Sequence, residues 1–215
     1  MASTNAKEAL MMRLASNASL RSQREELAQA FGLDELPLRI ECFDISHTSG
    51  EATVASCVVF GVDGPMKQSY RRFNIKDVAP GDDYAAIHQA VKRRYNRVKA
   101  GESAVPDLVF IDGGKGQLAS AVAALEEIEM QGLTIAGISK GVDRRAGDEQ
   151  IWLPGESRTV PIAGNSGAMH LIQQVRDEAH RFAVAGHRAS RNKARNVSPL
   201  EAIEGLGPKL SLIHI

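Results

Sequence analysis

The hydrophobic period of this chain changes near residue 82, and this change constrains the fold more than any other feature of the sequence. Before it, residues 38–46, 52–62 and 66–75 have the pattern of strands separated by turn-like stretches, which predicts an antiparallel meander. After it, apolar residues recur at three- and four-residue spacing, the period of an amphipathic helix. Helices and strands then alternate to the end of the patterned region.

The remaining elements follow from the same patterns. Residues 5–31 are rich in helix formers without Pro or Gly, and Pro37 marks a break after them. Further helices are predicted from Asp82, at 117–129 and at 168–185, and further strands at 108–111, 133–140 and 150–154. This order predicts an α/β fold: a ribonuclease-H-like mixed sheet, in which an antiparallel three-strand meander joins parallel strands, with flanking helices on both faces.

Two aspartates stand at unusual places in the predicted strands. Asp44 interrupts the strand-like "IECFDIS", and Asp112 ends the buried run in "LVFIDGGKGQL". Taken singly, Asp44 fits an exposed edge and Asp112 fits a turn. Their strands are predicted to be parallel neighbours, whose carboxyl ends form the ligand-binding edge of such sheets. Two carboxylates there repel each other unless a cation lies between them, and Mg²⁺ or Mn²⁺ prefers such oxygen ligands.

Two further residues are candidates for the same site. His180 lies at the flank of an apolar stripe on the last helix, where it is either a half-buried packing residue or a metal ligand or proton shuttle. Asp83 stands at a helix start, where capping and the helix dipole can account for it. The stretch "GGKGQ" does not match a phosphate-binding loop, because Gly116 and Gln117 follow Lys115 in place of Ser or Thr. ATP hydrolysis by such a loop is therefore excluded.

Positive charge gathers in two stretches although the formal net charge is zero. "KRRYNRVK" (92–99) and "RFAVAGHRASRNKAR" (181–195) each carry five Lys or Arg residues and no acidic residue, which suits the phosphates of duplex DNA. Few aromatic residues accompany them, with Tyr95 and Phe182 as exceptions, so base stacking is not indicated. The candidates for DNA contacts are Lys92, Arg93, Arg94, Lys115, Arg176, Arg188, Arg191 and Lys193.

Cys42 and Cys57 have a spacing that fits neither zinc binding nor a disulfide framework. They would face each other across two strands if Ser49 and Gly50 formed the tip of a tight hairpin, and we expect two buried thiols in a reducing compartment. No apolar run approaches the ~20 residues that cross a bilayer, and the N-terminus lacks a signal-peptide core. We therefore expect a cytoplasmic protein without a membrane partner.

Five stretches of the chain resemble one family, the C-terminal endonuclease half of UvrC, a component of the UvrABC excinuclease of bacterial nucleotide excision repair. They are "ECFDISHTSGEATVASCVVF", "YRRFNIKDVAPGDDYAAI", "PDLVFIDGGKGQL", "RDEAHRFAVAGHR" and "IEGLGPK". The resemblance implies an endonuclease domain that cuts damaged double-stranded DNA on the 5′ side of a lesion. It also implies a divalent metal, and UvrB and UvrA as partners.

The resemblance assigns active-site residues as well. The family's motifs match this chain at Asp44, Asp83, Asp112 and His180. Metal ligation is expected from Asp44 and Asp112, with His180 as a further ligand or a proton donor. The role of Asp83 comes from the resemblance alone, because the residue pattern explains it by capping.

Three regions are expected along the chain. They are a helical segment at 1–36, the endonuclease domain at 37–196, and the start of a helix-hairpin-helix module at 197–215, which ends in the atypical "LSLIHI". No segment matches the family's N-terminal nuclease domain, so we expect a fragment. Two alternatives stay open: a non-cleaving module of the same fold that docks DNA or a protein, and a hydrolase of small phosphoesters, which would need a closed pocket.

Overall fold

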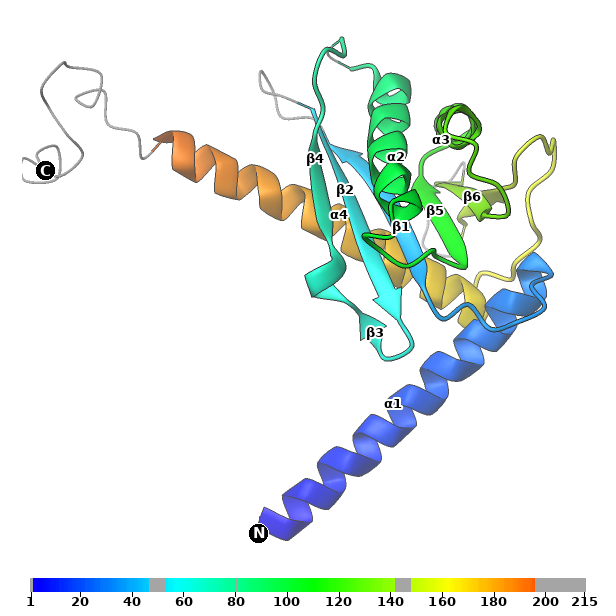
Figure 1. The fold of residues 1–215 in the computed structure, drawn as a ribbon. Coiled ribbons are helices and arrows are strands. Elements are labelled where there is room, and N and C mark those ends of the chain that lie inside the picture. The colour runs from blue at the N-terminus through cyan, green and yellow to red at the C-terminus, as the bar shows by residue number, and fades with distance from the viewer. Residues whose placement is uncertain (1, 47–52, 80, 142–147, 196–215) are drawn as a thin grey trace, which may run out of the picture. The chain divides into compact units, whose positions relative to one another are not determined.

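The computed structural model describes residues 2–46, 53–79, 81–141 and 148–195 (Figure 1). Within these ranges, side chains are described for residues 8 and 12 and from residue 15 to residue 185. Residues 1–183 form one unit of the structure and residues 184–215 a second. The helix-hairpin-helix start predicted at 197–215 lies outside the described residues.

One seven-stranded sheet runs through the described part of the chain. Its strands are β1 (Ile40–Ser46), β2 (Val54–Gly61), β3 (Gly64–Pro65), β4 (Arg71–Asn74), β5 (Leu108–Asp112), β6 (Thr134–Ser139) and β7 (Gln150–Trp152). The order is β3-β2-β1-β5-β6-β7, with β4 also paired to β2. β1 pairs antiparallel with β2 and parallel with β5, which confirms the predicted mixed sheet.

The third strand of the meander is shorter than the sequence predicts. In place of one strand over 66–75, the chain forms β3, then a 3-10 turn at Lys67–Ser69 (η1), and only then β4. The turn forms because the N–H of Ser69 donates to the carbonyl of Met66, at 2.9 Å, instead of to a neighbouring strand. β4 nevertheless pairs with β2 in the predicted antiparallel direction.

Helices cover both faces of the sheet, as predicted. They are α1 (Ala2–Phe31), α2 (Asp83–Lys99), α3 (Lys115–Glu127) and α4 (Gly167–Arg195). One core, which includes Phe43 and Ile111, lies between the sheet and the pair α2 and α3 (Figure 1). A second core, which includes Phe110 and Leu171, lies on the other face with α1 and α4. Among the described helices, none is both long and apolar enough to cross a membrane.

The register of β1 and β2 corrects the prediction for the two cysteines. The sequence predicts that Cys42 lies opposite Cys57. In the structure Cys42 pairs with Val58 and Phe43 pairs with Cys57, so the register differs by one residue. Because side chains alternate along a strand, this shift places the two thiols on opposite faces of the sheet. Both thiols are free and fully buried, as the sequence predicts.

A buried ion pair joins β1 to α2. The carboxylate of Glu41 is fully buried and accepts hydrogen bonds from Arg94, at 2.6 Å from Nη2 and 3.1 Å from Nε. The guanidinium of Arg39 donates to the same carboxylate, and the Tyr95 hydroxyl lies 3.4 Å from it. A buried carboxylate is tolerated only with such compensation. The pair therefore holds α2 at one position along β1.

We predict that Glu41→Ala lowers the free energy of unfolding by about 3–5 kcal/mol, because Arg94 would stay buried without its partner. Glu25→Ala is the matched control, since Glu25 pairs with Arg21 at 3.0 Å on an exposed face of α1. Exposed pairs contribute about 0–1 kcal/mol. Urea unfolding followed by circular dichroism measures both variants, and equal losses would contradict the structural role of the buried pair.

Candidate metal centre

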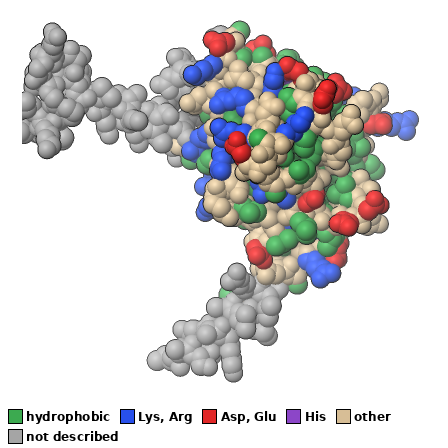
Figure 2. Space-filling model, viewed as in Figure 1, with side chains coloured by type: hydrophobic (Ala, Val, Ile, Leu, Met, Phe, Trp, Pro, Cys, Tyr) green, Lys and Arg blue, Asp and Glu red, His purple; other side chains and the backbone are tan. Residues whose placement is uncertain are grey.

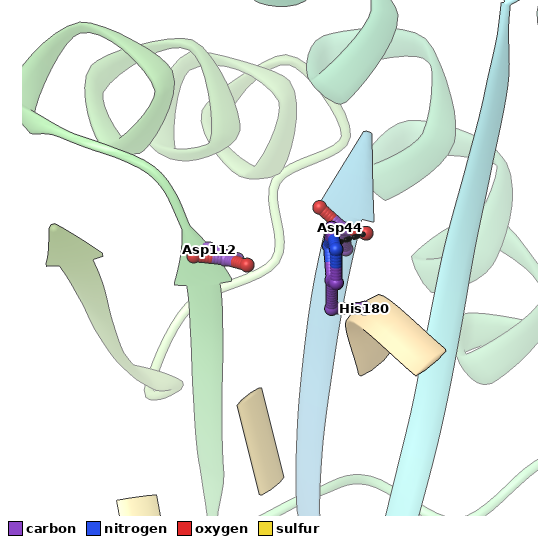
Figure 3. Close-up of side chains that lie close together, drawn as sticks. All are labelled: Asp44, Asp112 and His180. Carbon is purple, nitrogen blue, oxygen red and sulfur yellow. Dashed lines mark ion pairs between the residues drawn. The ribbon is translucent and has the colours of Figure 1, made fainter. Parts of the chain in front are cut away.

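Asp44 and Asp112 come together because β1 and β5 are parallel neighbours. The register pairs Phe43 with Ile111, so each aspartate is the next residue along its strand. Phe43 and Ile111 face the core under α2 and α3, and the alternation of side chains turns both aspartates toward the face that α4 covers. The two carboxylates therefore lie close together at the carboxyl ends of these strands, as the sequence predicts (Figure 3).

His180 joins this pair from α4. Ala179 is fully buried against the sheet, and His180 is the next residue on the helix, at the flank of the apolar stripe as the sequence predicts. Its Nδ1 lies 3.6 Å from Oδ2 of Asp44. One ligand atom from each of Asp44, Asp112 and His180 lies within 4.8 Å of the others (Figure 3). The His180 side chain is 68% exposed, whereas that of Asp44 is 8% exposed, so the group is open on the α4 side.

Burial and mutual repulsion make the two carboxylates costly to ionise. Burial, followed by the charges of Asp112 and Asp83, raises the pKa of Asp44 from 3.8 to about 7. Burial also raises the pKa of Asp112, although the positive charges of Arg176, His180 and Lys140 oppose this change. The site therefore favours either protons or a cation between its oxygens.

The environment of one Asp44 oxygen indicates that the site suits a cation. Oδ2 is buried and accepts no hydrogen bond from the described residues, although a buried polar atom normally has a partner. Two carboxylates and an imidazole are ligands that divalent cations accept. A cation would supply the missing partner of Oδ2, so these three residues fit a metal ion.

Asp83 lies next to the three residues but is not one of them. Asp82, not Asp83, caps α2, because the side chain of Asp82 accepts from the N–H of Ala85 at 2.9 Å. Capping therefore does not explain Asp83, although its place in the first turn of α2 suits the helix dipole. Its Oδ2 accepts a hydrogen bond from Gln117 Nε2 at 3.3 Å, and its charge contributes to the raised pKa of Asp44. The structure thus places Asp83 at the edge of the metal centre.

Three charged residues near the centre differ from the sequence prediction: Arg176 has other partners than expected, and Glu149 and Lys140 were not predicted at all. Arg176, predicted to contact DNA, donates to Glu149 at 2.8 Å and to Asp177 at 2.9 Å, and its charge acts on Asp112. Glu149 and Lys140 were not predicted. The position of Lys140, directly after β6, is the signal that could have found it, because β6 is parallel to β5 and ends at the same edge.

The first basic stretch is less available to DNA than the sequence predicts. Arg94 is 3% exposed and bound to Glu41, so its predicted DNA contact is wrong. The pattern of charges could not show this, because the amphipathic period of α2 places Arg94 on its buried side. Lys92 pairs with Glu127, and Arg93 is exposed while donating to the carbonyl of Asn74 at 2.8 Å.

Other charged candidates stay predictions. The side chain of Lys115 is exposed, donates to the carbonyl of Ser157 at 3.2 Å and lies over the Trp152 ring. The side chains of Arg188, Arg191 and Lys193 lie outside the described residues, although the backbone of α4 continues through them.

Comparisons with known proteins bear on this geometry. A family model described as UvrC RNAse H endonuclease domain matches residues 28–184. UvrABC system protein C of Pseudomonas putida is 56% identical over 209 residues, which are 97% of this chain and 34% of that protein. The same protein of Pseudomonas aeruginosa is 55% identical over 209 residues, with the same coverage. The chain spans about a third of the length of these curated relatives.

Solved structures show weaker similarity. Human ENDOV aligns over 79% of this chain and 98% of its own, with 11% identity and a TM-score of 0.48. Endonuclease V of Ciona intestinalis, in complex with a DNA 24mer containing inosine, aligns over 59% of this chain and 56% of its own, with 16% identity and a TM-score of 0.40. At these TM-scores neither similarity bears on function.

We predict that Asp44→Asn stabilises the metal-free fold at pH 8. The folded-state pKa of Asp44, about 7, lies above its ordinary value of 3.8, so its ionisation costs stability as the pH rises between these two values. Asn carries no charge and avoids this cost. At about 1.4 kcal/mol per pKa unit, the gain at pH 8 is on the order of 4 kcal/mol.

The gain is expected to disappear below pH 3.8, where Asp44 is protonated in both states. Thermal unfolding with a chelator present, at pH 8 and at pH 3.5, measures the difference. Asp34→Asn removes an exposed carboxylate and is the matched control, for which little change is expected at either pH. A variant Asp44→Asn that is no more stable than the parent at pH 8 would contradict the electrostatic account.

Proposed function

The chain belongs to the UvrC RNase H endonuclease domain family, and from this premise we propose that it makes the 5′ incision beside a lesion in damaged double-stranded DNA. The observation that carries the proposal is the meeting of Asp44, Asp112 and His180 with ligand atoms within 4.8 Å of one another. A domain that only docked DNA or a protein would have no need of a buried and a half-buried carboxylate together at one sheet edge, because their ionisation costs stability.

The proposed cofactor is a divalent cation, Mg²⁺ or Mn²⁺, because both ions prefer carboxylate oxygens. Asp44, Asp112 and His180 would hold it, and Oδ2 of Asp44 would gain its partner. When bound, the cation would supply charge for the phosphodiester and a lower pKa for the attacking water. Asp83, which is held by Gln117 and is close enough to act on Asp44, would orient that water by accepting a hydrogen bond from it.

Exposed basic residues support a DNA partner. Lys and Arg side chains gather over the β4 and α2 side of the face drawn in Figure 2. Arg71 and Arg93 are exposed on β4 and α2, whereas Arg72 is exposed on the opposite face of β4, where it lies over the Phe182 ring of α4. Arg93 and Lys115 are proposed phosphate contacts, together with Arg188, Arg191 and Lys193 on the far part of α4. UvrB and UvrA are the proposed protein partners, and the cytoplasm the proposed compartment.

We predict that the chain binds Mn²⁺ and that Asp44→Ala abolishes the binding. The Mn²⁺ affinity is expected to fall as the pH drops below about 7, because a proton and the cation compete for Asp44. Isothermal titration calorimetry between pH 6 and pH 8 measures both effects, with Asp34→Ala as the matched control. Unchanged Mn²⁺ affinity in Asp44→Ala would contradict the metal centre. The variant His180→Ala separates its two roles, since only a ligand would alter the affinity.

We further predict that Asp112→Asn lowers the rate of 5′ incision by more than about 100-fold, because even residues outside a ligand set often contribute 10–100-fold. The measurement is nicking of a lesion-bearing duplex in an assembled UvrABC system that contains this chain. The 3′ cut is the internal control, because the resemblance implies that the family's N-terminal nuclease domain makes it, and the assembled system supplies that domain together with this chain. Undiminished 5′ incision in the variant would refute the proposed function.

A further inference from the structure

A small cavity opens beside the metal centre, and among the residues that line it only Asp83 and its partner Gln117 have a part in the proposed reaction. Its volume is about 320 Å³, and Gly81, Asp83, Tyr84, Gly114, Gly116 and Gln117 line it. This volume lies at the lower end of the range for small-molecule sites, about 300–1,000 Å³. A DNA duplex is far too large to enter this cavity, whereas a single nucleobase has a suitable size.

Tyr84 gives the cavity an aromatic wall. It is 57% exposed, and it is the only aromatic residue among the large hydrophobic side chains exposed in the described part of the chain. It lies in the first turn of α2, directly after Asp83. An exposed tyrosine has an apolar ring and a polar hydroxyl group, a combination enriched where ligands and partners bind.

Gly116 explains why the ring can lie where it does. A Cβ atom at this position would be 2.6 Å from Cε1 of Tyr84 and 2.9 Å from its hydroxyl oxygen, both too close for real contacts. The ring therefore lies directly against the backbone of α3, on a surface that only glycine provides. This contact restricts the ring from one side and leaves the rest of it exposed to a ligand.

The other walls are polar. The Gln117 amide and the Asp83 carboxylate lie 3.3 Å apart in a hydrogen bond, and Gly81 and Gly114 contribute backbone without side chains. An amide, a carboxylate and exposed backbone offer donors and acceptors of the kind that pair with the edges of nucleobases. A flat ring on one side and hydrogen-bonding groups on the other suit a nucleobase better than a sugar or an aliphatic chain.

We propose that this cavity takes one unstacked base of the DNA strand, which stacks on Tyr84 beside the metal centre. This inference rests on the proposed function, because the chain must handle DNA for the cavity to meet a base. Asp83 connects the two sites: it lines the cavity, and its charge acts on Asp44. A base held on Tyr84 would set the position of the neighbouring phosphate along the strand. The cavity thus adds positional selection to a centre that by itself recognises only phosphate.

The test uses fluorine NMR of the chain labelled with 3-fluorotyrosine, in the presence of a chelator so that no cleavage occurs. The chain has three tyrosines, and the other two, Tyr70 and Tyr95, are 8% and 0% exposed. A single-stranded thymidine hexanucleotide is expected to shift the Tyr84 signal, which Tyr84→Phe identifies by its loss. An abasic oligomer of the same length has the same phosphates and is expected to leave the signal in place.

Affinity measurements complete the test. Tyr84→Ala is expected to weaken binding of the hexanucleotide roughly tenfold, the effect of losing one stacked base, whereas Tyr84→Phe keeps the affinity. Gly116→Ala displaces the ring and is expected to act like Tyr84→Ala, while unchanged signals of Tyr70 and Tyr95 show that the fold is intact. Equal shifts with the abasic oligomer, or an unchanged affinity in Tyr84→Ala, would overturn the inference. Either of these two outcomes would overturn only the base-binding inference. The proposed function is tested separately, by Mn²⁺ binding and by incision.

Discussion

The parallel pairing of β1 with β5 is the interaction on which the rest of the molecule depends. It brings two carboxylates to one sheet edge, one buried and one half-buried, so that the pKa of Asp44 rises to about 7 and that of Asp112 rises as well. Such an arrangement reduces the stability of the metal-free chain at neutral pH. Two cores, one on each face of the sheet, provide the hydrophobic stabilisation that offsets this cost.

The alternation of side chains along β1 explains how one strand serves both the core and the centre. Glu41 and Phe43 face α2, where the ion pair with Arg94 fixes the helix that carries Asp83. Asp44 faces the other way, toward His180 on α4. A slip of one residue in the pairing of β1 with its neighbours would exchange these two sets, so the buried pair and the metal centre depend on the same register. Fold and chemistry are thus specified together.

Sequence patterns predicted the parts of the structure that depend on periodicity and strand order. The meeting of Asp44 with Asp112 followed from the order of elements, and the flank position of His180 followed from the helical period. They could not predict the length of the hairpin loop, so the cysteine register was one residue off. Charge counts could not distinguish the buried Arg94 from its exposed neighbour Arg93, because that difference depends on packing against β1.

The same limit explains why the helical period, which places Tyr84 on one stripe with Ile87, Val91 and Tyr95, could not show that Tyr84 is exposed while Tyr95 is buried. Aromatic residues inside basic stretches stand out in a sequence, but Tyr95 is fully buried and lies against Glu41. Tyr84 lies outside both stretches, in the turn that carries Asp83, and its exposure depends on the absence of a side chain at Gly116, 32 residues further along the chain. The strands hold the two carboxylates, whereas the exposed groups, His180 and Tyr84, come from helices on opposite faces of the sheet. A substrate that reached both would therefore have to pass over the carboxyl edge of β1 and β5, where the carboxylates meet.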